Sequence, residues 1–441
     1  MAEPSKRVWG WMFFDWASQP YFTLMLTFIF GPYFASSVVN DPVLGQEYWG
    51  WMLATTGFII AISAPLLGSI ADGTGSRLRW IGSFSFIYFG SAISLWWAFP
   101  GSGQWMLILV AFGIGLTAVE LATIFTNALL PGLAPKSELG FVSGSGWAFG
   151  YAGGIVALLI SLLLLVENDA GVTLLDIPPV FGLDPDAREG TRATAIFTAF
   201  WFAIFMIPFF LWVRDGPVSP RDSRTVNGLA DTIRSLPGQK SLMAYLASSM
   251  FYRDALNGLF AFGGIYATGV LGWTQIEIGV FGIASLVSGC IFAWLGGFAD
   301  RKFGPKRVIV FCIALLSLVC AVIVTTSADM VLLFRVEEDS RMPDIVFMLC
   351  GCLIGAGGGV LQAVSRTMMV VQANPDRMTE AFGLYAFAGR ATAFLAPALI
   401  ATVTLVTGDQ RLGVIPLLFL FLAGLALMRW VNSEGYGHEV A

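Results

Sequence analysis

The stretches GSIADGTGSRLRW (residues 68–80) and GGFADRKFGPKRV (residues 296–308) are two copies of one pattern. Each copy places a glycine four residues before an aspartate, and a further glycine and basic residues follow the aspartate. The second copy has one additional residue between its aspartate and the following glycine. Two copies of one loop, separated by about half the chain, indicate an internal duplication and predict a protein of two related halves.

The composition between and around these loops is that of a membrane protein. Of the 441 residues, 56% are hydrophobic and 12% are charged, and the mean hydropathy is +0.76. Soluble domains carry about 25% charged residues. We therefore expect an integral protein of the lipid bilayer. The net charge of -5 and the lack of a basic cluster with interleaved aromatic residues predict no nucleic-acid partner.

Hydropathy and turn residues divide the chain into twelve expected membrane-spanning helices. The first six are expected over residues 9–38, 48–71, 80–99, 104–131, 140–166 and 193–213. The last six are expected over residues 241–270, 275–299, 307–328, 343–373, 378–407 and 412–432. The fold class is thus an all-α polytopic membrane protein with two six-helix bundles. We predict the first bundle over residues 1–213, a cytoplasmic linker over 214–240 and the second bundle over 241–441.

Lys and Arg are unevenly distributed between the two sets of loops. An even number of spans puts both termini on one side, and the flanks on that side hold most of the 24 Lys and Arg residues. Because cytoplasmic flanks retain these residues, both termini are predicted to be cytoplasmic. The short connections favour a prokaryotic cytoplasmic (inner or plasma) membrane. Tryptophans near the span ends, among them Trp11 and Trp273, are predicted to anchor the protein at the membrane interface.

The duplicated loop resembles the cytoplasmic loop signature of the major facilitator superfamily, G-x-x-x-D-x-x-G followed by basic residues. The matching residues of the first copy are Gly68, Asp72, Gly75 and Arg77. The resemblance implies the major facilitator fold, in which two six-helix bundles rock around a central cavity to give alternating access.

The charged residues of the two loops are candidates for gating. A small residue allows two helices to approach closely, and an aspartate can pair with a helix N-terminus or with an arginine. Such a contact stabilises one conformation. We expect this role for Asp72 and Arg77 in the first copy and for Asp300 and Arg301 in the second.

Longer strings resemble the vacuole effluxer-like branch of that superfamily, whose fungal members are autophagy-related exporters of amino acids from the vacuole. The resemblance implies export of an amino-acid-like solute. A lysine is common in this branch where Arg390 stands, which keeps the charge but changes its geometry. The strings are DWASQPYFTLMLTFIFGPYF from residue 15, FTNALLPGLAP from 125, GWAFGYAGG from 146, FYRDALNGLFAFGGIYA from 251, GGVLQAVSRTMM from 358 and FGLYAFAGRATAFLAP from 382.

Charged residues inside the expected spans are the candidate binding residues, because each costs about 2.5 to 3.5 kcal/mol at the bilayer centre unless it is paired or hydrated. These residues are Asp15, Glu120, Arg253, Asp254, Arg366 and Arg390. In the superfamily that the sequence resembles, spans one, four, seven and ten line the cavity. Asp15 and Arg366 are expected nearer the cytoplasmic side, and we hypothesise that together they help to close it.

The other four charges are expected near mid-membrane. We hypothesise that Arg390 or Arg253 binds a substrate carboxylate, while Glu120 or Asp254 binds an ammonium group or a coupling proton. Adjacent residues on a helix point about 100° apart, so Arg253 and Asp254 are not expected to share one partner. Matched acids and bases suit a zwitterion such as an amino acid. The alternative is that the buried charges only pair with one another and hold helices together.

Polar residues at helical spacing extend the candidate binding surface. Asn127 stands seven residues after Glu120, Asn257 four after Arg253, and Gln362 four before Arg366. Residues at these spacings lie on one helix face. A cavity wall and a polar contact between packed helices both explain the pattern.

The sequence contains no pairing of a nucleophile with a base, no metal-ligand cluster, no cofactor motif and no P-loop, so we expect neither an enzyme nor a metal or cofactor site. Transport of a small-molecule substrate would then be driven by a gradient of ions or solutes. Two alternatives are an exporter of amphipathic drugs or lipids, and a non-transporting membrane receptor or assembly factor. The only histidine, His438, lies in the polar tail.

Overall fold

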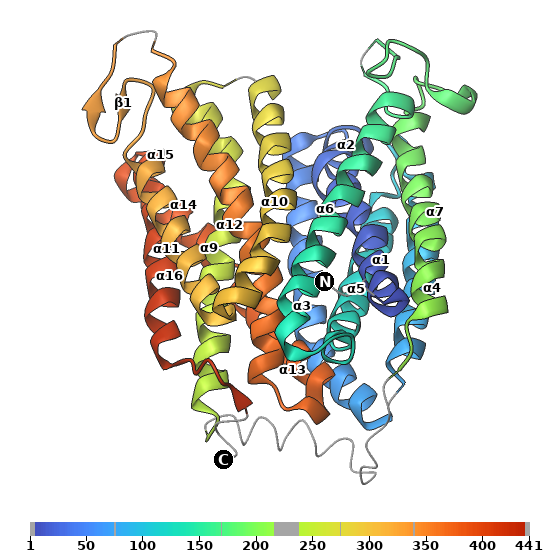
Figure 1. The fold of residues 1–441 in the computed structure, drawn as a ribbon. Helices are drawn as coiled ribbons and strands as arrows, with labels where there is room; N and C mark the ends of the chain where they lie inside the picture. Colours follow the sequence, from blue (N-terminus) through green and yellow to red (C-terminus); the bar gives the residue numbers. More distant parts are fainter. Residues whose placement is uncertain are drawn as a thin grey trace. The chain divides into compact units, whose positions relative to one another are not determined.

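The computed structural model describes residues 5–74, 76–168, 170–215, 238–273, 275–337 and 340–436. Helices make up almost all of this part of the chain, and one two-stranded hairpin joins two of them (Figure 1). Gly75 of the first loop copy, most of the predicted linker and His438 lie outside the described residues.

The chain divides into two compact units. The first consists of Met1–Ala64, Ala71–Leu129 and Phe149–Arg221. Its elements are α1 (Lys6–Pro20), η1 (Tyr21–Phe28), α2 (Phe30–Tyr33), η2 (Phe34–Val38), most of α3 (Pro42–Thr74), α4 (Arg77–Ser94), η3 (Leu95–Trp97), α5 (Trp105–Asn127), the later part of α6 (Leu139–Leu164), η6 (Val180–Gly182) and α7 (Glu189–Trp212).

The second unit consists of Pro65–Ile70, Leu130–Ala148 and Asp222–Ala441. It therefore includes a short part of α3 and the beginning of α6, preceded by η4 (Leu130–Gly132) and η5 (Lys136–Glu138). Its other elements are α9 (Lys240–Leu271), α10 (Gln275–Phe303), α11 (Pro305–Val324), β1 (Met330–Val331), β2 (Phe334–Arg335), α12 (Met342–Gln372), η8 (Pro375–Arg377), α13 (Met378–Ala391), α14 (Leu395–Thr407), α15 (Gln410–Gly413), α16 (Ile415–Leu427) and η9 (Met428–Trp430).

Ten helical segments among the described residues are long and apolar enough to cross a membrane. The other two expected spans correspond to α4 and α9, which are continuous helices of 18 and 32 residues. Both are more polar than the rest: α4 begins with Arg77, and α9 carries Arg253, Asp254 and Asn257. All twelve expected spans are therefore helical.

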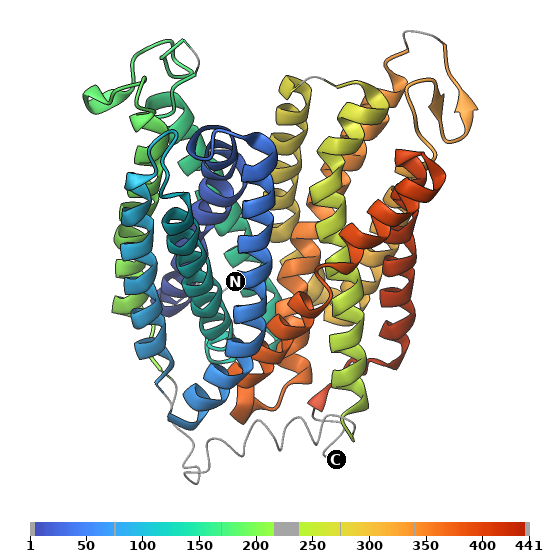
Figure 2. The same cartoon turned by 180° about the vertical axis from the view of Figure 1, so that it is seen from behind.

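Two expected spans are not single regular helices. The first expected span is an α-helix up to Pro20, which has no N–H to donate. From there, wider π-type turns continue over Tyr21–Phe28. The eleventh was expected as one helix over 378–407 but is interrupted between Ala391 and Leu395, as Figure 2 shows in orange and red. Pro397 explains this break, because its ring would clash with the carbonyl of Ala393 in a continuous helix, whereas the first turn of a new helix accommodates it.

The prediction that Trp11 and Trp273 are interface anchors is wrong. Trp11 is completely buried, and its indole N–H donates to the carbonyl oxygen of Thr126 at 2.8 Å. Trp273 is 6% exposed, and its indole N–H donates to Asp344 Oδ1 at 2.6 Å. Position near a span end does not determine whether a tryptophan faces lipid or a neighbouring helix.

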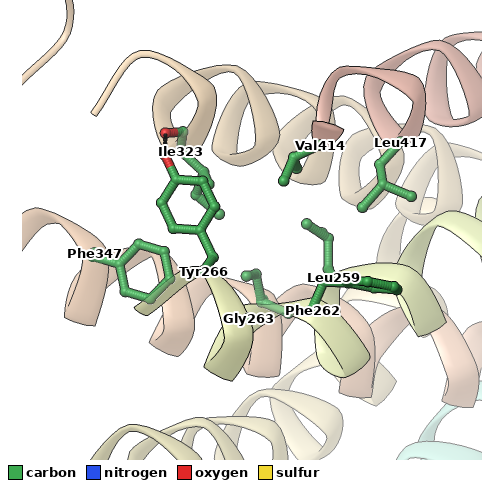
Figure 3. A pocket seen from close by; sticks show the side chains of 9 residues that line it. Leu259, Phe262, Gly263, Tyr266, Ile323, Phe347, Val414 and Leu417 are labelled. Carbon is green, nitrogen blue, oxygen red and sulfur yellow. Dashed lines mark hydrogen bonds between the residues drawn. The ribbon is translucent and has the colours of Figure 1, made fainter. Parts of the chain in front are cut away.

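A small apolar cavity of about 10 Å³ lies inside the second unit, where α9, α11, α12 and α16 meet (Figure 3). The hydroxyl of Tyr266 lies 2.7 Å from the carbonyl oxygens of both Ile323 and Thr326, so the one polar group of the lining is satisfied. A cavity of this size and lining is expected to stay dry. The lining residues are Leu259, Phe262, Gly263, Tyr266, Ile323, Phe347, Ile354, Val414 and Leu417.

Candidate functional site

The beginning of α6 contacts α12 through a buried arginine. Arg366 of α12 is 4% exposed, and its Nη2 donates to the carbonyl oxygen of Ser143 at 3.1 Å. The Ser143 hydroxyl in turn donates to the carbonyl oxygen of Ala363 at 2.6 Å. The Arg366 guanidinium carbon lies 5.1 Å from the ring centre of Trp147, a cation–π distance. The predicted gating arginine is therefore held by α6 on two sides.

The second loop copy contacts the same part of α6. Asp300 is 4% exposed and packs directly against Gly140, where a Cβ atom would overlap its carboxyl group. Because Gly140 lies in the first turn of α6, the positive end of the helix dipole favours this carboxylate. Arg301 forms an ion pair with Glu138 at 3.1 Å, but both side chains are well exposed, so this pair contributes about 0 to 1 kcal/mol.

Close backbone approach makes this contact between α6 and α10 possible. A Cβ atom at Gly144 would lie 2.6 Å from the carbonyl oxygen of Ala293 and 2.8 Å from the Cα of Gly297. Any side chain at Gly144 would therefore push α10 away from α6. The second glycine of the GGFAD string, Gly297, thus has a direct packing role.

The first loop copy uses a related arrangement at the beginning of another helix. A Cβ atom at Gly68 would lie 2.7 Å from the carbonyl oxygen of Thr379 and 3.0 Å from the backbone nitrogen of Glu380, in the first turn of α13. Asp72 forms an ion pair with Arg77 at 2.7 Å, and its side chain is only 5% exposed. In each copy, a glycine or the aspartate of the loop packs against the first turn of a helix.

The interruption of span eleven lies against α9 at Asp254. Asp254 of α9 is 2% exposed, and its Oδ2 accepts a hydrogen bond from the backbone N–H of Ala396 at 3.0 Å. Its Oδ1 is buried and has no hydrogen-bond partner among the described residues. Arg390 stands in the last turn of α13, immediately before the interruption.

Arg253 contacts the preceding part of α13. Its Nη1 donates to the carbonyl oxygen of Tyr385 at 3.0 Å, and its guanidinium carbon lies 4.3 Å from the centre of the Tyr385 ring. A side chain at Gly389 would overlap this guanidinium group. Arg253 thus contacts α13, whereas the neighbouring Asp254 contacts α14.

The remaining candidate residues are placed as follows. Asn257 is exposed on α9 and Gln362 is half-buried on α12. In the first unit, Glu120 and Asn127 are half-buried on α5. Asp15 is half-buried on α1, and a Cβ atom at Gly150 of α6 would lie 3.1 Å from its Cβ.

Tyrosines around Arg253 were not identified from the sequence. The Tyr245 hydroxyl donates to the carbonyl oxygen of Ser365 at 2.7 Å, and the Tyr252 and Ser365 hydroxyls lie 2.8 Å apart. The rings of Tyr245 and Tyr385 are stacked with centres 6.0 Å apart. The spacing of Tyr245 and Tyr252, one heptad apart on α9, was the available signal for a shared face.

One protein family and several known proteins are similar to this chain over two thirds of its length or more. The sequence profile of the family described as Vacuole effluxer Atg22 like matches residues 51–439. The MFS-type transporter YxiO of Bacillus subtilis is 24% identical over 98% of this chain and 96% of its own length. Autophagy-related protein 22-1 of Aspergillus clavatus is 22% identical over 68% of this chain, which spans only half of that fungal protein.

Solved structures of major facilitator superfamily transporters share the fold. The transporter FucP in the outward conformation superimposes with a TM-score of 0.71 at 14% identity, covering 96% of this chain and 97% of FucP. The proton:xylose symporter XylE superimposes with a TM-score of 0.71 at 13% identity, covering 97% of this chain and 95% of XylE. These structures confirm the expected all-α fold. The family profile and the similarity to YxiO confirm the expectation of a transporter rather than an enzyme. The chain is an integral membrane protein of the major facilitator superfamily and belongs to the Vacuole effluxer Atg22 like family.

Proposed function

We propose that this protein is a secondary active transporter that exports a small zwitterionic, amino-acid-like solute by alternating access. The observation that carries the proposal is the interruption between α13 and α14, which has Arg390 at its edge and Arg253 and Asp254 of α9 beside it. Transporters commonly bind substrates and coupling ions where a membrane helix is discontinuous. One arginine and one acid beside the interruption, Arg390 and Asp254, would match the two charges of a zwitterion.

The contacts favour a division of roles among these residues. Arg253 already donates to Tyr385 and lies on its ring, so we assign Arg253 to positioning α13. We assign the substrate carboxylate to Arg390. The Asp254 carboxyl group is the candidate for the substrate ammonium group or a coupling proton, because its Oδ1 is buried without a partner among the described residues. Glu120 remains the alternative acid.

We further propose that the protein lies in the cytoplasmic membrane with both termini in the cytoplasm, as the distribution of Lys and Arg favours. On this orientation, the two loop copies lie at the cytoplasmic ends of their helices. Their contacts with the first turns of α6 and α13 would then stabilise the state that is closed to the cytoplasm. Asp72, Arg77, Asp300 and Arg301 would act as gating residues, with Asp15 and Arg366 closing the same side.

The experiment is counterflow of radiolabelled amino acids, dipeptides, organic acids and cationic drugs in proteoliposomes that contain the full chain, with and without a pH gradient. We expect uptake of one zwitterionic class, its loss in Arg390→Ala and partial retention in Arg390→Lys. Asp254→Asn should abolish either binding of the amine or the response to the pH gradient. Arg429→Ala, at an exposed arginine, is the matched control.

Other results would decide against the proposal. Transport only of amphipathic cations, unchanged in Arg390→Ala, would identify a drug or lipid exporter. Absence of flux and of thermal stabilisation by every solute, in protein that remains folded, would favour a receptor or assembly factor.

A further inference from the structure

The hairpin between α11 and α12 has an apolar tip in an unfavourable backbone conformation. Strands β1 and β2 pair Val331 with Phe334, which leaves Leu332 and Leu333 as a two-residue turn. Both leucines have positive φ angles, 51° and 69°. Such turns favour Asn-Gly because residues with a Cβ atom and a branched side chain rarely adopt this conformation. The conformation therefore displays two leucines where turn chemistry alone would select polar or glycine residues.

No other part of the described chain covers most of the side-chain surface of the tip. Leu332, Leu333 and Phe334 are 49%, 70% and 78% exposed, respectively. Isolated exposed apolar residues are common, but three in succession at a turn form a small apolar surface.

The base of the hairpin is held firmly. The Ser327 backbone N–H donates to the carbonyl oxygen of Met330 at 2.7 Å. In the turn itself, the Leu333 backbone N–H donates to the carbonyl oxygen of Thr325 at 3.1 Å. The Tyr266 hydroxyl of α9 lies 2.7 Å from the carbonyl oxygen of Thr326. The exposed tip is thus a fixed part of the fold and not a loose loop.

Apolar exposure continues from the tip into the helix that follows the hairpin. Met342, Ile345, Leu349 and Leu353 are exposed at helical spacing, beginning at the first residue of α12. Figures 1 and 2 both show the hairpin projecting sideways from the end of α11 and α12, beyond α15, instead of over the helices of its own unit. Because α11 and α12 are long and apolar enough to cross a membrane, a hairpin that projects sideways from their ends is placed to reach the surface of the surrounding bilayer.

We propose that Leu332, Leu333 and Phe334 insert into the headgroup boundary of the bilayer and anchor this end of α11 and α12 at a fixed depth. Arg335, exposed and next to the tip, is placed to bind lipid phosphate groups. The anchor uses the fixed base of the hairpin to hold the ends of two helices while other parts of a transporter move. It is independent of the identity of the transported solute.

The test uses the full-length protein with Leu333→Cys, labelled with the fluorophore NBD and reconstituted into nanodiscs of phosphatidylcholine and phosphatidylglycerol. The native cysteines are buried or half-buried, and background labelling is measured on the unsubstituted chain. Glu337→Cys, at an exposed polar position of the same loop, is the matched control. We expect blue-shifted emission at position 333 and strong quenching by lipids that carry a nitroxide at headgroup depth, with neither effect at position 337.

A second variant keeps the hairpin and removes the anchor. Leu332→Asn with Leu333→Gly supplies the preferred turn residues, and a label at Phe334→Cys should then lose its quenching by lipid. Emission at position 333 typical of water would overturn the proposal. Emission typical of an apolar site, without quenching by lipid but with disulfide cross-linking between two copies of the unlabelled Leu333→Cys variant, would overturn it in favour of contact between two copies of the chain.

Discussion

Arg366 of α12 donates a hydrogen bond to the carbonyl oxygen of Ser143 in α6 at 3.1 Å, and its guanidinium group lies over the ring of Trp147. A single buried cation thus joins α12 to the beginning of a helix from the first half of the sequence. Together with Asp300 against Gly140, it makes the beginning of α6 part of the second unit.

The close contact between α6 and α10 should be sensitive to one methyl group. Gly144→Ala places a Cβ atom 2.8 Å from the Cα of Gly297 and should destabilise the contact by about 1 to 3 kcal/mol. The Cys290 thiol, which donates to the carbonyl oxygen of Ala148 at 3.3 Å, should then react several-fold faster with a polar maleimide. Gly279→Ala in α10, where nothing lies within 4 Å of the new atom, is the control. An unchanged Cys290 rate in folded Gly144→Ala would show that α10 adjusts without separating.

Transport should depend on the planar shape of the Arg366 guanidinium group as well as on its charge. Arg366→Lys keeps the charge but loses the planar group that contacts Ser143 and Trp147, so we expect transport to fall several-fold.

The hypothesis that Asp15 pairs with Arg366 predicts that a double charge reversal restores transport. Asp15→Arg combined with Arg366→Asp should recover the activity that each single reversal loses. The measurement is initial flux in proteoliposomes. A double variant no better than either single variant would refute the pairing.

The apolar cavity makes opposite predictions for two of its lining residues. Leu259→Ala enlarges the cavity and should lower the free energy of unfolding by about 2 to 5 kcal/mol. Gly263→Ala adds a Cβ atom that meets only Phe281, at 3.5 Å. This substitution should raise the free energy of unfolding by up to about 1 kcal/mol, because alanine favours the helix. Thermal unfolding in detergent measures both. Gly351→Ala, whose Cβ atom would overlap the Phe281 ring, should be destabilising, and equal melting temperatures for the two glycine variants would contradict the packing.

Asp215 caps α4 from the segment that follows α7. Its carboxyl oxygens accept from the Leu78 backbone N–H at 3.2 and 3.4 Å. Burial raises the pKa of the Asp215 carboxyl above its ordinary value of 3.8, against the opposing effects of this hydrogen bond and of Arg77. The folded chain therefore binds this proton more tightly than the unfolded chain. Its contribution to stability is largest below pH 3.8 and falls as the pH rises through the folded pKa.

Two substitutions separate the cap from the charge. Asp215→Asn keeps an acceptor for Leu78 and removes this pH dependence, so stability at neutral pH should be unchanged or slightly higher. Asp215→Ala loses the cap and should be less stable by about 1 kcal/mol. Melting temperatures measured from acid to neutral pH provide the comparison, and equal losses in both variants would show that the charge itself is required.

Much of the candidate site could be predicted from the sequence, because placing a charged side chain in lipid costs free energy. Arg253, Asp254 and Arg390 were identified because ionisable residues are rare in membrane helices and must find partners. Which partners they find depends on neighbouring helices that are distant in sequence. Tyr385 of α13, before the interruption, and Ala396 of α14, after it, contact adjacent residues of α9.

The amino-acid sequence was sufficient to predict the class of fold, since long apolar segments can satisfy their backbone groups in a bilayer only as helices. The duplicated loop predicted two related halves. Pro397 also carried a local signal for the interruption of span eleven. Tertiary structure alone decided the burial of Trp11, the contact of Asp300 with the first turn of α6 and the capping of α14 by Asp254. These features depend on which helix faces meet, and hydropathy does not encode that choice because lipid and protein interiors are similarly apolar.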